Sequence, residues 1–160
     1  MSDRSFNVLF VCAENSNRSI LAEAVLRHWG RDRFRAFSAG FNPSGEVDKL
    51  AIDTLKAANL PTDELRSKSW QEFAAPGAPP MDFVISLCDT PAAKLEGTLP
   101  GHPLLAHWTI TDPAAARESA PKQRNALRHA LQELENRVRL FVLLRHEKPR
   151  PLPSAQAAAV

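Results

Sequence analysis

Apolar residues in this chain occur in short runs typical of strands and in longer stretches with helical spacing, and the two patterns alternate. Residues 6–11 are almost continuously apolar, which indicates a strand covered on both faces. Further strands are expected at 34–39, 82–88 and 104–108. Helices are expected at 18–29 before Gly30, at 47–58 before Pro61, and over a last stretch with one apolar stripe: Leu127, Leu131, Leu134, Val138 and Phe141. This alternation predicts an α/β fold with a mostly parallel sheet and helices on both faces.

The remaining stretches are less regular. Residues 69–72 fit a capping box for a short helix, residues 74–80 are rich in proline and glycine and predict a surface loop, and residues 89–103 hold a helical turn. The composition after Lys148 is typical of disorder. We therefore predict one domain over residues 1–148, followed by a disordered tail at 149–160.

The loop between the first strand and the first helix carries the clearest chemical signal. Cys12 ends the strand, and Arg18-Ser19 opens the helix. Backbone N–H groups and the positive end of the helix dipole then converge on one point, which predicts an oxyanion site and a lowered pKa for Cys12. Arg18 adds a planar fork that can bind two oxygens of a tetrahedral anion. The alternative is that Cys12 is only a small buried apolar residue.

Composition excludes several classes of protein. A net charge of +2 gives no support for nucleic-acid binding, and the basic residues of the last helix are expected on a solvated face: Arg124, Arg128, Arg137, Arg139 and Arg145. The five histidines lack ligand-like spacing, so no metal site is indicated. No leader-like or membrane-spanning stretch is visible, and we expect a cytoplasmic protein without nucleic-acid or membrane partners.

The two cysteines are expected to lie near each other. Cys12 and Cys88 each follow a predicted strand, and ligands of parallel sheets bind beyond the carboxyl ends of the strands. In a reducing compartment, a pair of cysteines is more often catalytic or free than a structural disulfide. This convergence is a second indication of a site at that edge.

Several motifs together resemble a known family. They are Val8–Glu23, Ser38-Ala-Gly40, Leu65–Trp70, Asp82–Asp89, and His107-Trp108 through Asp112-Pro113. In this order they resemble the low-molecular-weight tyrosine phosphatase fold family and, within it, the thioredoxin-coupled type of arsenate reductase. The resemblance implies a three-layer sandwich with a four-stranded parallel sheet. His-Trp before Asp-Pro resembles the reductase branch, since the phosphatase branch usually has an aromatic pair after Asp-Pro, where Ala114 stands here.

The resemblance also implies roles for individual residues. Cys12 is the expected nucleophile, Asp112 the general acid that protonates the departing oxygen, and Cys88 the redox partner of Cys12. Asn15 is expected to stabilise an unusual loop backbone, and Ser19 to hydrogen-bond the thiolate. The expected oxyanion ligands are the Arg18 side chain and the backbone N–H groups of the loop: Ala13, Glu14, Asn15, Ser16, Asn17 and Arg18. From sequence alone, Asp112 could equally be a turn residue and Cys88 a buried core residue.

Three departures from the family pattern affect the expected activity. Residues 89–103 lack the third cysteine of the reductase relay, and Glu96 lies about where it is expected. Glu14 replaces a usual glycine, and Asn17 replaces a small residue or cysteine. A carboxylate at the rim of an anion pocket repels a charged ligand. A Cys12–Cys88 disulfide would then require direct attack by an external thiol, from thioredoxin, glutaredoxin or a small thiol.

These observations leave three hypotheses for function. The first is an arsenate reductase-like enzyme that uses Cys12 and Cys88. The second is a low-molecular-weight protein tyrosine phosphatase, which forms a cysteinyl-phosphate and needs only Cys12, Arg18 and Asp112. The third is an oxyanion-binding module whose loop has lost turnover. None implies a metal or an organic cofactor, because side chains supply the nucleophile, the anion ligand and the acid.

Overall fold

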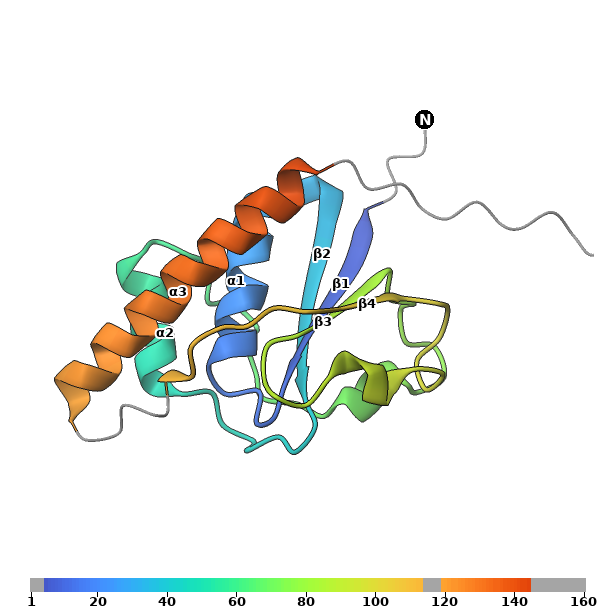
Figure 1. Ribbon diagram of the computed structural model, residues 1–160, viewed down its shortest axis with the longest axis horizontal. Coiled ribbons are helices and arrows are strands. Elements are labelled where there is room, and N and C mark those ends of the chain that lie inside the picture. Colours follow the sequence, from blue (N-terminus) through green and yellow to red (C-terminus); the bar gives the residue numbers. More distant parts are fainter. Residues whose placement is uncertain (1–4, 114–118, 145–160) are drawn as a thin grey trace, which may run out of the picture.

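The computed structural model describes residues 5–113 and 119–144 (Figure 1). Its strands are β1 (Phe6–Cys12), β2 (Phe34–Gly40), β3 (Phe83–Ser86) and β4 (Leu104–His107). Its α-helices are α1 (Arg18–Gly30), α2 (Lys49–Ala57) and α3 (Ala120–Leu143). Three short 3₁₀-helices complete the order: η1 (Arg31–Arg33), η2 (Trp70–Phe73) and η3 (Ala92–Leu95).

The four strands form one parallel sheet in the order β2-β1-β3-β4, as predicted. The central position of β1 explains its sequence, because Val8 to Val11 are fully buried between two layers. All four strands run in the same direction, so their carboxyl ends meet at the lower edge of the sheet in Figure 1. The loop after β1 lies at this edge.

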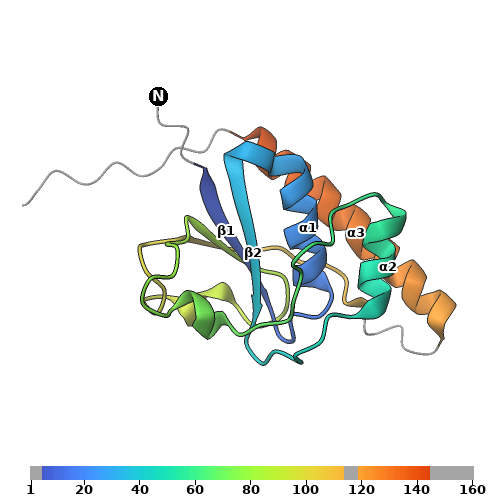
Figure 2. The same cartoon turned by 180° about the vertical axis from the view of Figure 1, so that it is seen from behind.

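Two different layers cover the sheet, which confirms the three-layer arrangement. α1, α2 and α3 lie together on one face, where α1 and α3 bury Val8 and Phe10 (Figures 1 and 2). The other face, which contains Leu9 and Val11, is covered by η2, η3 and the loops beside them. The second helical layer therefore consists of 3₁₀ turns, since proline- and glycine-rich segments leave no room for long helices there.

Most element boundaries agree with the sequence prediction to within two residues. The predicted stripe on α3 is buried, and its arginines at 124, 128, 137 and 139 are exposed. β3 ends at Ser86, so Cys88 follows the strand at a distance of two residues. The expected capping box at 69–72 is only half formed: Ser69 accepts from the Gln71 N–H, and Arg66 binds the Glu72 carboxylate. Arg145 and the predicted tail at 149–160 lie outside the described residues.

Within the described ranges, none of the helices combines the length and apolarity needed to cross a membrane.

Candidate active site

The residues from Cys12 to Arg18 wrap around a small pocket at the carboxyl end of β1. The pocket has a volume of about 140 Å³, and Asp112 completes its lining. The site therefore brings together all the residues expected to bind an oxyanion. α1 begins directly at Arg18, because the Asn17 side chain accepts a hydrogen bond from the Arg18 N–H and caps the helix. The positive end of the helix dipole thus points into the pocket.

Arg18 is held in place by main-chain oxygens on two other segments. Its Nη1 donates to the carbonyl oxygens of Leu87, at 3.0 Å, and Ile110, at 3.3 Å. Its Nη2 lies 3.7 Å from Asp112 Oδ2. Its Nε is buried and has no hydrogen-bond partner within the described part of the chain. Buried donors are almost always paired, so the guanidinium presents a donor that an oxyanion oxygen can satisfy.

Cys12 and Cys88 form a hydrogen-bonded pair of free thiols beside Arg18. Both are buried, with 5% and 7% of their surfaces exposed. The hydrogen bond from Cys12, a hydrogen bond with the Thr90 backbone and the charge of Arg18 lower the pKa of Cys88 to about 5. The expectation of a low pKa at Cys12 itself is wrong for this state, since the hydrogen bond to Cys88 and burial raise the Cys12 pKa. The hydrogen bond between the two thiols favours ionisation of Cys88 over Cys12, so once the pair has lost one proton the remaining proton lies between the two sulfurs.

Asn15 supports the loop from behind, in the way that the sequence predicted. Its backbone is left-handed, with φ of 51°, and its side chain is fully buried. Its Nδ2 donates to Ser19 Oγ at 2.8 Å and to Ser38 Oγ at 3.0 Å, and its Oδ1 accepts from the Lys68 N–H at 2.9 Å. The expected bond from Ser19 to the Cys12 thiolate stays a prediction.

A buried ionic cluster extends this support deeper into the protein. Ser38 Oγ donates to Glu23, which is also bound by Arg27. Lys68 Nζ lies 3.8 Å from Glu23 Oε1, and the side chains of Lys68 and Glu23 are only 8% and 3% exposed. Burial lowers the pKa of Lys68, while the charge of Glu23 opposes this effect. A charged pair at this depth is stable only while both partners and their hydrogen bonds are present.

The segment 66–69 and the end of β2 press against the outer side of the loop. Ser67 Oγ donates to the Glu14 carbonyl at 3.0 Å, and the Gly40 N–H donates to the Lys68 carbonyl at 2.8 Å. A Cβ atom at Gly40 would lie 2.9 Å from the Ala13 oxygen and 3.0 Å from Asn15 Cβ. Only glycine permits this approach.

These supporting residues were not predicted to belong to the site. Glu23, Lys68 and Gly40 occur in motifs that carried the family resemblance, but no role followed from their residue types. One signal was available: Glu23 stands between Ala22 and Ala24 on the apolar face of α1, where a charge needs a buried partner. Arg27 stands four residues further along the same helix, but the other two partners, Ser38 and Lys68, lie 15 and 45 residues away in the chain.

The departures from the family pattern take positions that the loop tolerates. The side chain of Glu14 is exposed at the pocket rim, and Asn17 acts as the cap of α1.

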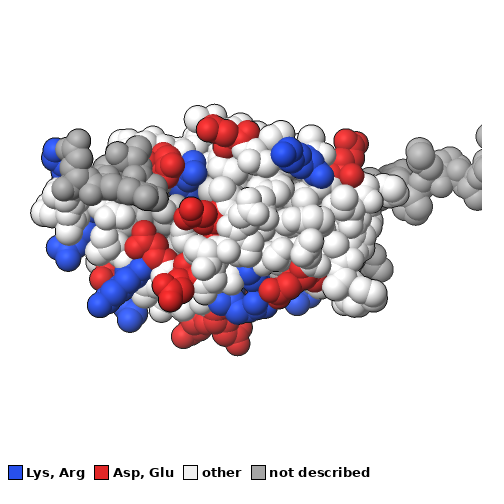
Figure 3. Space-filling model, turned by 90° about the horizontal axis from the view of Figure 1, so that it is seen from below, with Lys and Arg blue, Asp and Glu red and all other residues white. Residues whose placement is uncertain are grey.

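Asp112 is half exposed on the loop that follows β4. Glu96, in the position of the missing third cysteine, is an exposed residue at the end of η3. Figure 3 looks onto this end of the sheet and shows acidic and basic side chains mixed on its surface.

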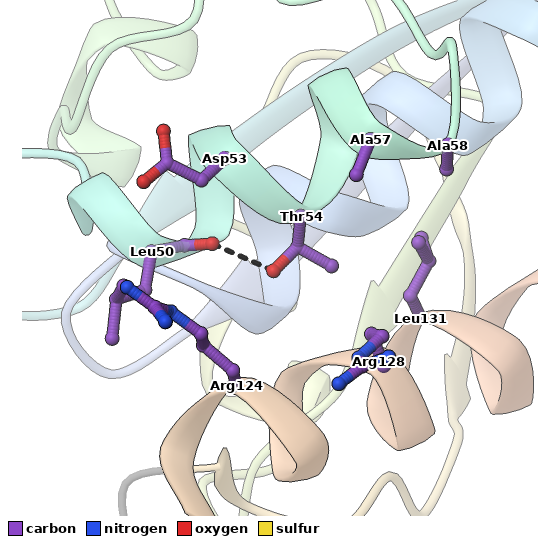
Figure 4. Close-up of a pocket in the computed structure, with 8 residues that line it drawn as sticks. All are labelled: Leu50, Asp53, Thr54, Ala57, Ala58, Arg124, Arg128 and Leu131. Carbon is purple, nitrogen blue, oxygen red and sulfur yellow. Dashed lines mark hydrogen bonds between the residues drawn. The ribbon is translucent and has the colours of Figure 1, made fainter. Parts of the chain in front are cut away.

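A larger hollow of about 410 Å³ lies elsewhere, between α2 and α3 (Figure 4). Its floor is mostly apolar, and its polar lining consists of Asp53, Thr54, Arg124 and Arg128. Thr54 Oγ1 is bound to the Leu50 carbonyl. Neither cysteine is among the described residues that line this hollow. In the described ranges, no group of three or more His, Cys, Asp or Glu residues could hold a metal ion.

A parallel sheet with a Cys-x5-Arg loop beyond its central strand defines a class of cysteine-dependent enzymes that act on tetrahedral oxyanions. A model of the low molecular weight phosphotyrosine protein phosphatase family matches residues 7–149, and the chain belongs to this family. An arsenate reductase of Shouchella clausii is 28% identical over 134 residues, which are 84% of this chain and 93% of that protein.

Solved structures agree with this assignment. A structure described as an arsenate reductase in the phosphate binding state has a TM-score of 0.67 and 25% identity, and the match covers 86% of this chain and 96% of that chain. The tyrosine phosphatase Wzb from Escherichia coli K30, solved in complex with sulphate, has a TM-score of 0.66 and 21% identity, with coverage of 87% and 97%. At that identity the likeness shows the fold alone.

Proposed function

We propose that this chain is a thiol-dependent arsenate reductase. The observation that carries the proposal is the second thiol: Cys88 is hydrogen-bonded to Cys12 at an oxyanion pocket whose arginine has an unpaired, buried Nε. A phosphatase needs one cysteine, whereas reduction of arsenate by two electrons needs two thiols. The arsenate reductase relatives, which match most of the chain, support the same choice.

The first step is attack of Cys12 on arsenic. The shared proton passes from Cys12 to Cys88, and the Cys12 thiolate attacks arsenate held by Arg18 and the loop N–H groups. A sulfur–arsenic bond forms and one arsenic–oxygen bond breaks. Asp112, beside Arg18 at the pocket wall, supplies the proton with which this oxygen leaves as water.

The second step moves the electrons. Cys88 returns its proton to solvent, and its thiolate attacks the sulfur of Cys12. A disulfide forms, the sulfur–arsenic bond breaks, and its electron pair stays on arsenic. Arsenic is reduced from the pentavalent to the trivalent state and leaves as arsenite. Two thiolates have been oxidised to one disulfide.

An external thiol must then reduce the disulfide, because the chain has two cysteines and no third one to relay it. Thioredoxin, glutaredoxin or a small thiol can supply the two electrons. Both cysteines are free, which fits a reducing compartment, and we place the protein in the cytoplasm on this ground. No metal or organic cofactor takes part in these steps.

The proposal is tested by adding stoichiometric arsenate to the fully reduced protein without external thiol. We expect both thiols to disappear, arsenite to be released, and mass spectrometry of peptides to show a Cys12–Cys88 disulfide. Two intact thiols, with no arsenite even after a small thiol is added, would contradict the proposal.

The second candidate is a phosphomonoester hydrolase, favoured by the position of Asp112 at the pocket wall and by the family description. Cys88→Ser separates the two enzymes: we expect it to retain hydrolysis of an aryl phosphate and to lose arsenate turnover. Unchanged arsenate turnover would exclude the role of Cys88. Phosphate binding without turnover of either substrate would instead indicate an oxyanion-binding module.

A further inference from the structure

The mouth of the Cys12 pocket is bordered by carboxylates. Glu14 lines the anion pocket and also a second hollow of about 610 Å³ that adjoins it. Glu46 and Asp48 line the second hollow as well, and among the described residues of its lining Lys49 is the one cation. Among the described residues that line the second hollow, three acidic side chains therefore stand against one basic side chain.

The fold does not need the charges of Glu14 and Glu46. The Glu14 carbonyl accepts hydrogen bonds from Ser67 and Ser44, but its carboxylate lies in solvent. Glu46 likewise interacts with Ser44 through its backbone. Asp48 differs, because its carboxylate caps α2. Across the ranges 5–113 and 119–144, neither glutamate side chain has a hydrogen-bond or ion-pair partner, so neither charge is neutralised by an ion pair in these ranges.

The oxyanion and the second reactant meet these charges differently. Arsenate is held by Arg18 and the loop N–H groups inside the pocket, where attraction acts at hydrogen-bond distance. The thiol that regenerates the enzyme is not held by these anion-binding groups of the pocket. Its approach is governed by the summed charge at the mouth, which attracts cations and repels anions over about one Debye length.

We propose that Glu14 and Glu46 are specificity residues that select the low-molecular-weight thiol by charge, favouring cationic over anionic thiols. The inference rests on the proposed reductase function. Regeneration takes two exchanges: one thiol attacks the Cys12–Cys88 disulfide and forms a mixed disulfide, and a second attacks that bond and leaves as the oxidised small molecule. Both protein thiols are thereby reduced. Each exchange brings the small thiol past the same carboxylates.

A matched series of two-carbon thiols tests the proposal: cationic cysteamine, neutral 2-mercaptoethanol and anionic 2-mercaptoethanesulfonate. Steady-state arsenate turnover is measured at saturating arsenate, and rates are expressed per thiolate. We expect cysteamine to react about tenfold faster than the sulfonate at low ionic strength, with 2-mercaptoethanol between them. Added salt should bring the three rates together.

Variants assign the effect to residues. Glu14→Gln and Glu46→Gln should each reduce the ratio of the cationic to the anionic rate by about two- to threefold, and the double variant should reduce it further. Asp32→Asn is the matched control, because Asp32 is an exposed acid in η1 at the opposite end of the sheet. It should leave the ratio unchanged. Equal rates for the three thiols, or a ratio that the double variant does not alter, would overturn the inference.

A second measurement does not depend on arsenate. The reduced protein is mixed with cystamine, a dicationic disulfide, or with neutral bis(2-hydroxyethyl) disulfide, and loss of thiols is followed. We expect the ratio of the rate with cystamine to the rate with the neutral disulfide to be higher for the wild type than for the double variant. Failure of arsenate turnover with every thiol, while this ordering holds, would reject the reductase function alone. Absence of the ordering would reject the charge selection.

Discussion

The two sides of the anion loop are built on opposite principles. Behind the loop, Asn15 is fully buried, and both ends of its amide are hydrogen-bonded. In front of it, Arg18 keeps an unpaired Nε, and the exposed Glu14 carboxylate faces solvent. At the back, polar groups form hydrogen bonds within the protein, whereas at the front some polar groups are left available to bind a ligand. The difference separates groups that hold the fold from groups that act on a substrate.

This contrast predicts that variants on the two sides differ in kind. Changes at the front should lower activity with little effect on the free energy of unfolding. Changes at the back should lower the free energy of unfolding, and activity only as a consequence. Two measurements on each variant, turnover and urea denaturation, therefore test the contrast directly.

The largest effect is expected at the front, for Cys12→Ser. The hydroxyl is a far weaker nucleophile, so arsenate turnover should fall by at least about 10³-fold. The free energy of unfolding should change by less than about 1 kcal/mol, since the side chains are similar in size. A variant that unfolds much more easily would contradict the separation of the two sides.

Asn15→Ala is the strongest test of the back. Alanine is strained at a φ of 51°, and Ser19, Ser38 and the Lys68 N–H lose a buried partner. The free energy of unfolding should fall by about 3 kcal/mol. Asn125→Ala, on the exposed surface of α3, is the control and should change it by less than about 0.5 kcal/mol. Equal stability of the two variants would show that the buried network contributes nothing.

The thiol pair gives a prediction in pH. The hydrogen bond from Cys12 is the largest cause of the low Cys88 pKa of about 5. In Cys12→Ala this donor is absent, so the pKa of Cys88 should rise by about two units or more, toward the ordinary value of 9.0. The check is the alkylation rate of Cys88 against pH, read by mass spectrometry. Cys88 of the wild type should still be alkylated at pH values where Cys88 of Cys12→Ala no longer reacts. Coincident pH profiles for the two proteins would exclude the effect of the hydrogen bond from Cys12 on Cys88.

The smallest effect is expected for Lys68→Met. Its loss leaves Glu23 with Arg27 as the remaining cation, so the free energy of unfolding should fall by about 2 kcal/mol. Lys56→Met is the control, because Lys56 is exposed on α2. Chemical denaturation of both variants at neutral pH decides the matter, and a Lys68→Met protein as stable as the control would show that Arg27 alone balances the buried carboxylate.

Sequence patterns predicted the front of the site well. Cys12 and Arg18 are predicted because a strand, a short loop and a helix bring the residues between them to one point, and the structure has this strand and helix at the expected positions. At the back of the loop, the resemblance implied an unusual backbone for Asn15, and the structure gives it a left-handed φ of 51°. Asp112 was placed by resemblance alone, and the structure puts it in the lining of the pocket.

The rest of the back of the site, and the hydrogen bond between the two thiols, were not predicted. The ionic cluster joins Glu23 on α1, Ser38 on β2 and Lys68 on a loop, and no local pattern relates these positions. The pKa of Cys12 was predicted in the wrong direction, because the hydrogen bond with Cys88, which follows β3, and burial outweigh the effect of Arg18. The second outer layer is present as expected, but its helices are short 3₁₀ turns, because the segments there are rich in proline and glycine.

The sequence by itself determined the order of strands and helices, the buried central strand and the anion loop, because these depend on periodicity and on neighbours within a few residues. Only the tertiary structure decided the sharing of a proton between Cys12 and Cys88, the orientation of Arg18 by the Leu87 and Ile110 carbonyls, and the pairing of Glu23 with Lys68. These features depend on the distance and burial of groups that lie far apart in the chain, and folding alone sets both.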